Sequence, residues 1–357
     1  MEAVIPARQV ERVHATRTAD IWRDQAVLSV LGFWMAIGLA IDTRRHRTDP
    51  SLDTFFTSAH GLLYAGWLAC SLFTLYIVRR NRAHTTTLRD AIPRGLEPAV
   101  GGAAVFGLGG IGDLIWHTRY GIERDFKILF SPTHLLLMTA MLMVTFGPVR
   151  VLWMSHSTAD ERPTLARLWP AAVAAGSMAS VLFVFFQYVP AFERPVFTTS
   201  IPPLFKSFGV LLQSYSVLSV LITTLLYFGT MLLMARRWPL PFGSFFIVAA
   251  VICTSMYIFT DFRRSRLLLA FLIGAVLCDM LQHVATKLLS PRAAYRVLGG
   301  VGPLLLWGSY LVLTVPGHPI ELDAEVWSGS VLWSGLVGLA ITVLLLPPRS
   351  APATHLD

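Results

Sequence analysis

The sequence has 357 residues, of which 54% are hydrophobic and only 14% are charged. Soluble domains carry roughly 25% charged residues, so this composition excludes an ordinary soluble protein and indicates an integral membrane protein. The formal net charge is +8, but the Lys and Arg residues lie at the ends of apolar runs, where the positive-inside bias places them. We therefore expect no nucleic-acid partner.

Apolar runs follow one another along the whole chain, and most are close to the ~20 residues that cross a bilayer core. They are apolar on all sides, which predicts α-helices and not the alternating strands of a membrane barrel. We predict an all-α integral membrane protein, a bundle of about ten transmembrane helices in contact with the lipid bilayer. The runs cover residues 26–41, 59–78, 98–117, 132–149, 168–189, 208–234, 242–260, 267–287, 297–315 and 329–346.

The N-terminal 25 residues are polar and lack the apolar stretch of a secretory signal, so we expect no cleaved signal. An inner N-terminus places most Lys and Arg residues on the inner side and the acidic loop 316–327 outside. We expect both termini to lie inside, in the cytoplasmic membrane of a bacterium. The predicted regions are a polar segment (1–25), repeated helical hairpins (26–150), further membrane helices (151–347) and a polar tail (348–357).

The first half of the chain contains an internal repeat. The stretch "GLAIDTRRHRTDPSLDTFFTSAHGLLYAG" (38–66) resembles "GGIGDLIWHTRYGIERDFKILFSPTHLLLMTA" (109–140), and both join the end of one helix to the start of the next. In each copy an Asp is followed four residues later by a His, and a second His opens the next helix. The residues are Asp42, His46 and His60 in the first copy and Asp113, His117 and His134 in the second.

The spacing of these residues predicts a metal site. An Asp and a His four residues apart share one face of a helix, and a His on the neighbouring helix adds a third ligand. Two imidazoles and one carboxylate make an open-sided site for copper, iron or zinc, and the expected topology brings both copies to the outer side. Asp113 lies inside an apolar helix, where ionisable groups are costly and usually functional. For Asp42, beside several arginines, an interfacial structural role stays open.

A third Asp-x-x-x-His occurs at Asp279 and His283, again followed by a Ser-Pro. Arg292 stands near the place of the third ligand, and the expected topology puts this copy at the opposite membrane face. It is a weaker candidate site, and a structural role for both residues stays open.

The second copy resembles the copper-site segment in the C subunit of copper membrane monooxygenases, the particulate methane and ammonia monooxygenase family. The resemblance rests on residues 109–140. It implies that Asp113, His117 and His134 bind copper and that Arg124 and Asp125 order the loop or support the ligands. The family's second metal site has no counterpart in 185–215, which contains no histidine, so the first copy is the second candidate site.

Residues near the ligands are candidates for orienting them by hydrogen bonds. These are Trp116, Thr133, Tyr64 and Arg124, with interfacial packing as the alternative. Met138, Met141 and Met143 in the following helix suggest a thioether path for Cu(I), although methionines in membrane helices commonly serve packing.

Three classes of function follow. The first is a membrane metalloenzyme, a copper oxidoreductase or monooxygenase that acts on an apolar small molecule and depends on a reductant or partner subunit. The second is a copper-binding or copper-handling membrane protein without catalysis. The third is a transporter whose buried Asp and His residues relay protons or bind a cation. Bis-histidine haem ligation is a weaker fourth reading, because it leaves the carboxylates unexplained.

Overall fold

The structure is a computed structural model, and it describes residues 7–49, 54–123, 129–155, 163–187, 191–193, 195–197, 209–316, 320 and 322–346. Within these residues the protein is all-helical, as predicted. The helices are α1 (Ala7–Thr48), α2 (Ser58–Arg82), α3 (Leu88–Ala91), α4 (Glu97–Tyr120), α5 (Pro132–Met154), α6 (Leu165–Phe185), α7 (Gly209–Arg237), α8 (Ser244–Phe259), α9 (Ser265–Leu288), α10 (Pro291–Thr314) and α11 (Ala324–Leu345).

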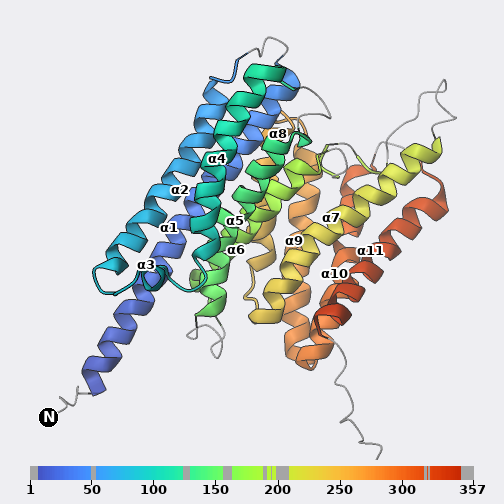
Figure 1. Ribbon diagram of the computed structural model, residues 1–357. Helices are drawn as coiled ribbons and strands as arrows, with labels where there is room; N and C mark the ends of the chain where they lie inside the picture. Colours follow the sequence, from blue (N-terminus) through green and yellow to red (C-terminus); the bar gives the residue numbers. More distant parts are fainter. Residues whose placement is uncertain are drawn as a thin grey trace, which may run out of the picture. The chain divides into compact units, whose positions relative to one another are not determined.

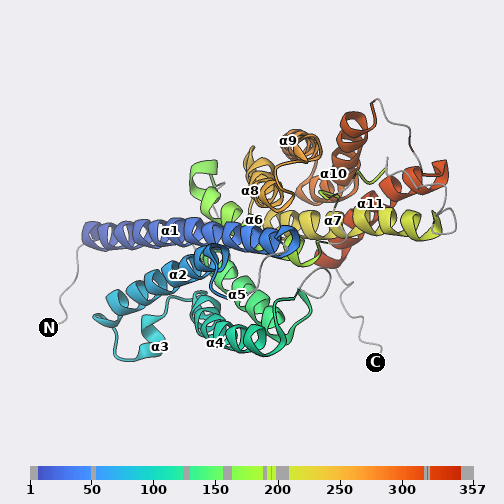
Figure 2. The same ribbon diagram turned by 90° about the horizontal axis from the view of Figure 1, so that it is seen from above.

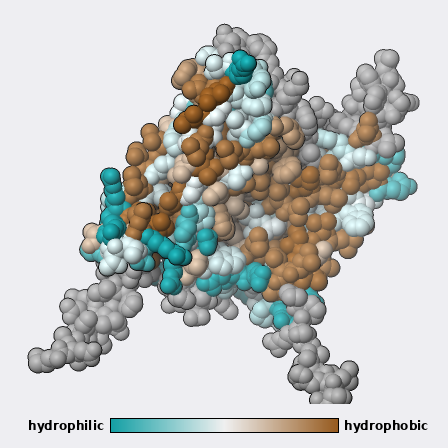
Figure 3. Space-filling model, in the orientation of Figure 1, coloured by the Kyte–Doolittle hydropathy of each residue, from teal (hydrophilic) through white to brown (hydrophobic). Residues whose placement is uncertain are grey.

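Nine of the described helices are long and apolar enough to cross a membrane. The predicted span 242–260 corresponds to α8, which has only 16 residues and reaches about 24 Å at 1.5 Å per residue. That length is less than the ~30 Å of a bilayer core. Hydrophobic side chains cover the flanks of the helices and hydrophilic ones gather toward their ends (Figure 3), which is the distribution expected of an integral membrane protein.

The first helix is longer than the apolar run that predicted it. The run ended at residue 41, but the membrane span extends over Asp20–Thr48 and α1 itself begins at Ala7. Asp42 and His46 therefore lie within the last two turns of a continuous helix. The polar residues that end the hydrophobic run do not end the helix, because their side chains find partners on neighbouring helices.

The helices fall into two compact units, residues 1–188 with 247–263, and residues 189–246 with 264–357. In the first unit α1 packs on α2, α5 and α6, while α4 packs on α5 and α2. The C-terminal ends of α1 and α4 and the N-terminal ends of α2 and α5 lie at the same end of this unit, opposite the N-terminal end of α1 (Figure 1). In the perpendicular view α2, α4 and α5 lie on the same side of α1 (Figure 2).

Glycines allow the helices of the first unit to approach closely. A Cβ atom on Gly38 of α1 would lie 2.7 Å from the Cα of Leu63 in α2. A Cβ atom on Gly110 of α4 would lie 2.6 Å from Cε1 of Tyr64. Small residues at such crossings let membrane helices pack backbone against backbone, and here they draw α1 and α4 onto α2.

In the second unit α9 packs on α10, α10 on α11, and α7 on α11. Buried polar side chains bind the segment that precedes α7: the hydroxyl of Tyr310 donates to the carbonyl of Ala191 (2.9 Å) and accepts from the amide of Val196 (3.3 Å). Trp307 Nε1 donates to Thr224 Oγ1 at 2.9 Å. These bonds satisfy polar groups that lie away from water.

Candidate metal centre

The ends of the helices position the four predicted histidines. His60 and His134 are the third residues of α2 and α5. The amide of His60 donates to Thr57 Oγ1 at 3.1 Å, and the amide of His134 donates to Ser131 Oγ at 3.3 Å. These are N-terminal caps, which satisfy amides that lack a partner within the helix. Both caps therefore hold a histidine in the first turn of a helix, facing the end of the preceding one.

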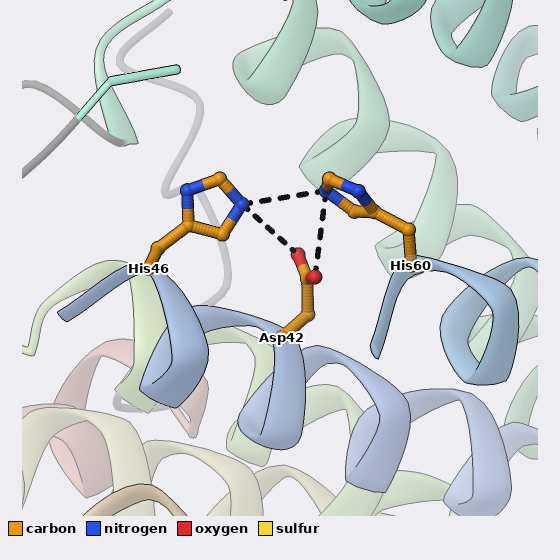
Figure 4. Close-up of side chains that lie close together, drawn as sticks. All are labelled: Asp42, His46 and His60. Carbon is orange, nitrogen blue, oxygen red and sulfur yellow. Dashed lines mark hydrogen bonds and ion pairs between the residues drawn. The ribbon is translucent and has the colours of Figure 1, made fainter. Parts of the chain in front are cut away.

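Asp42, His46 and His60 form the first group, which we call the first triad (Figure 4). Oδ1 of Asp42 lies 3.4 Å from Nε2 of His60, and Oδ2 lies 3.9 Å from Nε2 of His46. The two Nε2 atoms are 3.3 Å apart. All three side chains are buried, so three donor atoms meet in one small volume.

Asp113, His117 and His134 form the second triad. A single oxygen, Oδ1 of Asp113, lies 3.4 Å from Nε2 of His117 and 3.1 Å from Nε2 of His134. The hydroxyl of Thr133 donates to the same oxygen at 3.1 Å. Asp113 is only 1% exposed, which places this carboxylate in the interior of the helix bundle.

The two triads lie together in one cluster. The ring centroid of His117 is 5.9 Å from that of His46 and 5.9 Å from that of His60. The rings of His46 and His134 are 6.4 Å apart. The sequence predicted two candidate sites at the same membrane face, and the structure brings their six residues into direct neighbourhood.

Hydrogen bonds fix the orientation of three of the imidazoles. Nδ1 of His60 lies 2.5 Å from the carbonyl oxygen of Phe55, and Nδ1 of His46 lies 3.3 Å from that of Glu123. A carbonyl oxygen only accepts, so each of these Nδ1 atoms donates. Nδ1 of His117 faces the carboxylate of Glu123 at 3.1 Å. In each ring Nε2 is left to face the cluster, the arrangement usual for metal-bound histidines.

The donor atoms fit a metal ion. Metal–nitrogen bonds of about 2.0–2.1 Å at tetrahedral angles place neighbouring ligand atoms about 3.3 Å apart. The contacts of Nε2 with the Asp oxygens within the two triads span 3.1 to 3.9 Å. Nε2 of His117 is buried without a hydrogen-bond partner. Imidazole nitrogens and carboxylate oxygens at these distances are placed so that they could share a metal ion.

Glu123 belongs to the cluster, although the sequence did not predict it. Its carbonyl oxygen accepts from His46, and its carboxylate faces His117. With His117 and His134 it forms a further set of donor atoms within 4.8 Å of one another. Burial raises the pKa of this carboxyl, but the contacts with the two histidines outweigh burial and hold the pKa below its ordinary value. No spacing pattern marks Glu123, because it lies in the connection after α4.

A small cavity adjoins the cluster. About 30 Å³ of it is open to the centres of water molecules, which is space for one or two waters and far less than a porphyrin occupies. Its walls combine donor residues with apolar side chains. The lining includes Asp42, His46, His60, Asp113 and His134, together with Tyr64, Leu137, Met138 and Met141.

Some of the predicted supporting residues lie beside the ligands and others do not. Thr133 bonds to Asp113, and Tyr64 lines the cavity with its hydroxyl buried near Asp113. Trp116 instead packs on Tyr120, with ring centroids 4.6 Å apart. Arg124 and Asp125 lie outside the described residues. Of the methionines, Met138 and Met141 line the cavity, whereas Met143 lies against glycines of α4.

The third Asp-x-x-x-His does not assemble a set of donors. The carboxylate of Asp279 accepts from the amides of Phe245 (3.1 Å) and Phe246 (3.0 Å) at the start of α8. His283 is exposed. Ser290 caps α10 by accepting from the amide of Ala293 (3.4 Å), so an alanine stands where the other two hairpins carry their second histidine. Asp279 thus has a structural partner, and no donor set that includes it is found among the described residues.

Comparison of this chain with protein-family models, with curated protein sequences and with solved structures found no match. The residues of the cluster are therefore the guide to function.

Proposed function

We propose that this protein is a copper-binding integral membrane protein of the oxidoreductase class, resembling a membrane monooxygenase in its metal ligands. Its ligands are the two triads, and its substrate is an apolar small molecule that enters from the bilayer. With both termini inside, the cluster lies at the outer leaflet, within reach of an external reductant or partner subunit.

One observation carries this proposal, namely the inward orientation of Nε2 atoms in a buried cluster. Nδ1 of His46 and of His60 is bound to a backbone carbonyl oxygen, and Nδ1 of His117 faces the carboxylate of Glu123. Nε2 of His46 and of His60 therefore faces Asp42, and Nε2 of His117 faces Asp113. A cluster that served only packing would have no reason to gather carboxylates and imidazoles in the interior of a membrane protein, where ionisable groups are costly.

The chemistry of the donors and walls favours copper over zinc and iron. Imidazole-rich sites suit copper, and thioethers are soft ligands that select Cu(I). Met138 and Met141 line the same cavity as the imidazoles. Copper in such a site would supply one-electron exchange between a reductant and a small oxidant. The chain's own residues would hold the ion and keep bulk water away from it.

A second candidate function is copper handling without catalysis. It is favoured by the size of the cavity, which holds one or two water-sized molecules beside the donors and leaves little room for an organic substrate. The same methionines would pass Cu(I) to the histidines. This function uses the same ligands, so it differs from the first only in whether a substrate reacts.

Metal analysis of the purified protein tests the proposal. We expect copper to remain with the wild-type protein in detergent and to be lost from His117→Ala and His134→Ala. His283→Ala is the matched control, because this histidine also follows an Asp by four residues but is exposed and outside the cluster. A folded wild type that binds no copper, iron or zinc when supplied with each would overturn the proposal.

Activity separates the classes of function. An oxidoreductase yields an oxidised product that depends on O₂, a reductant and bound copper. Copper transfer to an acceptor without any product supports handling. Uptake of a solute into liposomes that depends on a proton gradient and not on O₂ would instead support a transporter.

A further inference from the structure

We infer that a small arginine-rich surface beside the cluster is the docking site of an acidic electron-carrier protein. The surface, which we call the arginine patch, consists of Arg44 and Arg47 near the end of α1 and of Phe262 and Arg263 in the turn between α8 and α9. This inference rests on the proposed function, because it names the class of reductant and the place where the reductant binds.

One aspartate holds the patch together. Arg44 Nε lies 3.2 Å from Oδ1 of Asp261, and Arg263 Nη2 lies 3.0 Å from Oδ2 of the same residue. The guanidinium carbon of Arg44 lies 5.4 Å from the ring centroid of Phe262, and that of Arg47 lies 4.5 Å from the ring centroid of the last residue of α8. Three arginines therefore gather around a single negative charge, and the patch keeps an excess of positive charge.

The turn that carries Phe262 has an unusual backbone. Asp261 and Phe262 have φ angles of 58° and 59°, in the left-handed region that glycine usually occupies at the end of a helix. This conformation costs free energy in a bulky residue, and such strain concentrates at functional sites. In this turn the ring of Phe262 is 49% exposed and lies beside Arg44.

The exposure and composition of the patch fit a protein partner. Arg47 and Arg263 are exposed, and Arg44 is half-buried. Aromatic residues and arginine contribute strongly to binding at protein interfaces. Electron-transfer complexes are small and transient, and opposite charges on the two partners speed their association. A small surface of arginines around an exposed ring is therefore suited to an acidic carrier.

The position of the patch disfavours a lipid headgroup as its occupant. The patch lies at the end of α1 that carries His46, which is the outer face in the proposed orientation. Basic residues are normally enriched on the inner face, and the anionic lipids that attract them belong to the cytoplasmic leaflet. Arginines on the outer face therefore need a different negatively charged partner.

The patch adjoins a proposed ligand. Arg44 and Arg47 flank His46 in the sequence of α1, and His46 is buried with its Nε2 facing Asp42. An electron from a docked carrier would cross only this short segment of α1 to reach the cluster. In this step the carrier loses one electron, and Cu(II) held by the cluster gains it and becomes Cu(I).

Binding of flavodoxin, a small acidic electron carrier, tests the patch without copper. The metal-free full-length protein would be placed in nanodiscs of a zwitterionic lipid, and association would be followed by fluorescence. We expect binding that weakens as salt rises and much weaker binding of cytochrome c, a basic carrier. Arg263→Glu should slow the association of flavodoxin by about 10-fold or more. Arg79→Glu is the matched control, because Arg79 is exposed in the last turn of α2, away from His60 and the cluster.

A second variant tests the ring. Phe262→Gly keeps a residue that favours the left-handed turn and removes the aromatic side chain, so it should bind flavodoxin more weakly at every salt concentration. With copper bound, the rate of Cu(II) reduction by flavodoxin should fall in Arg263→Glu by the same factor as the association rate.

The outcomes separate this inference from the proposed function. Equal binding of the acidic and the basic carrier, or unchanged flavodoxin binding in Arg263→Glu, would overturn the inference. Loss of bound anionic lipid from Arg263→Glu with unchanged flavodoxin binding, seen by native mass spectrometry, would overturn it in favour of a lipid site. A wild type that binds flavodoxin but no copper would support the patch and overturn the proposed function.

Discussion

The α1/α2 and α4/α5 hairpins bring the same three side chains together but hold their carboxylates differently. Asp42 uses one oxygen for each histidine, and its side chain is 13% exposed. Asp113 turns a single oxygen to both histidines and accepts a further bond from Thr133, and its side chain is 2% exposed. One position differs beside the second histidine, because Ala59 stands in the first hairpin where Thr133 stands in the second, and only the second hairpin has a hydroxyl there to donate to its Asp.

The same sequence spacing therefore yields two unequal groups of side chains. The second triad has a more buried and more constrained carboxylate, so less order remains to be gained when an ion binds. The first triad has a looser carboxylate, but the ring of Phe55 stacks on His60 with centroids 4.8 Å apart. We expect the second triad to contribute more to copper binding than the first.

The largest expected effect comes from the carboxylates. Asp113→Asn should lower copper affinity by more than the ~10–100-fold typical for the loss of an outer partner, because it removes a direct ligand of two contacts. Asp42→Asn should cost less affinity. Competition titration with a chelator measures both. Equal losses in the two variants would show that the hairpins bind with equal strength.

The second prediction concerns the contact that joins the hairpins. In Gly110→Ala the new methyl group would lie 2.6 Å from Tyr64, so α4 or the Tyr64 ring must move. We expect a loss of about 1–3 kcal/mol in the free energy of unfolding, as for overpacked cores. Gly61→Ala is the control, because no atom lies within 4 Å of its added methyl group. Thermal unfolding in detergent measures both, and equal stability would contradict the close approach.

The third prediction makes the second hairpin resemble the first. Thr133→Ala removes the hydroxyl that bonds to Asp113 and should lower the copper affinity of the second triad by about 10-fold. Thr133→Ser keeps the oxygen and should retain most of the affinity. Titration of the two variants side by side measures the effect, and identical affinities would mean that the hydroxyl does not orient the carboxylate.

The smallest expected effect is at the helix caps. Thr57→Ala and Ser131→Ala should each cost about 1 kcal/mol of stability and loosen His60 and His134 in turn. Thr57→Ser, which keeps the capping oxygen, should be close to neutral. The measurements are unfolding in detergent and copper affinity. A stable Ser131→Ala variant that also keeps its copper would show that the cap does not position His134.

The sequence predicted the helical class, most of the spans and the six residues of the triads, because hydrophobic length and Asp-x-x-x-His spacing are local properties. The sequence could not predict that the two triads lie together in one cluster, since this depends on how α1, α2, α4 and α5 pack. Glu123 gave no signal, because its role comes from a connection that folds back over His46. Spacing also could not separate Asp279 from Asp113. That distinction lies in the partners, which are backbone amides for one and imidazoles for the other.

The anchored Nδ1 atoms have a consequence for the protein before it meets its metal. In a zinc finger the ion organises the chain, and removal of the ion unfolds the domain. Here His46, His60 and His117 are already aimed by carbonyl and carboxylate oxygens of the polypeptide. Loss of the ion would therefore leave these side chains in the same orientation and the helices folded. If the cluster binds the proposed ion, the ion could then be exchanged repeatedly at the membrane without an unfolded state.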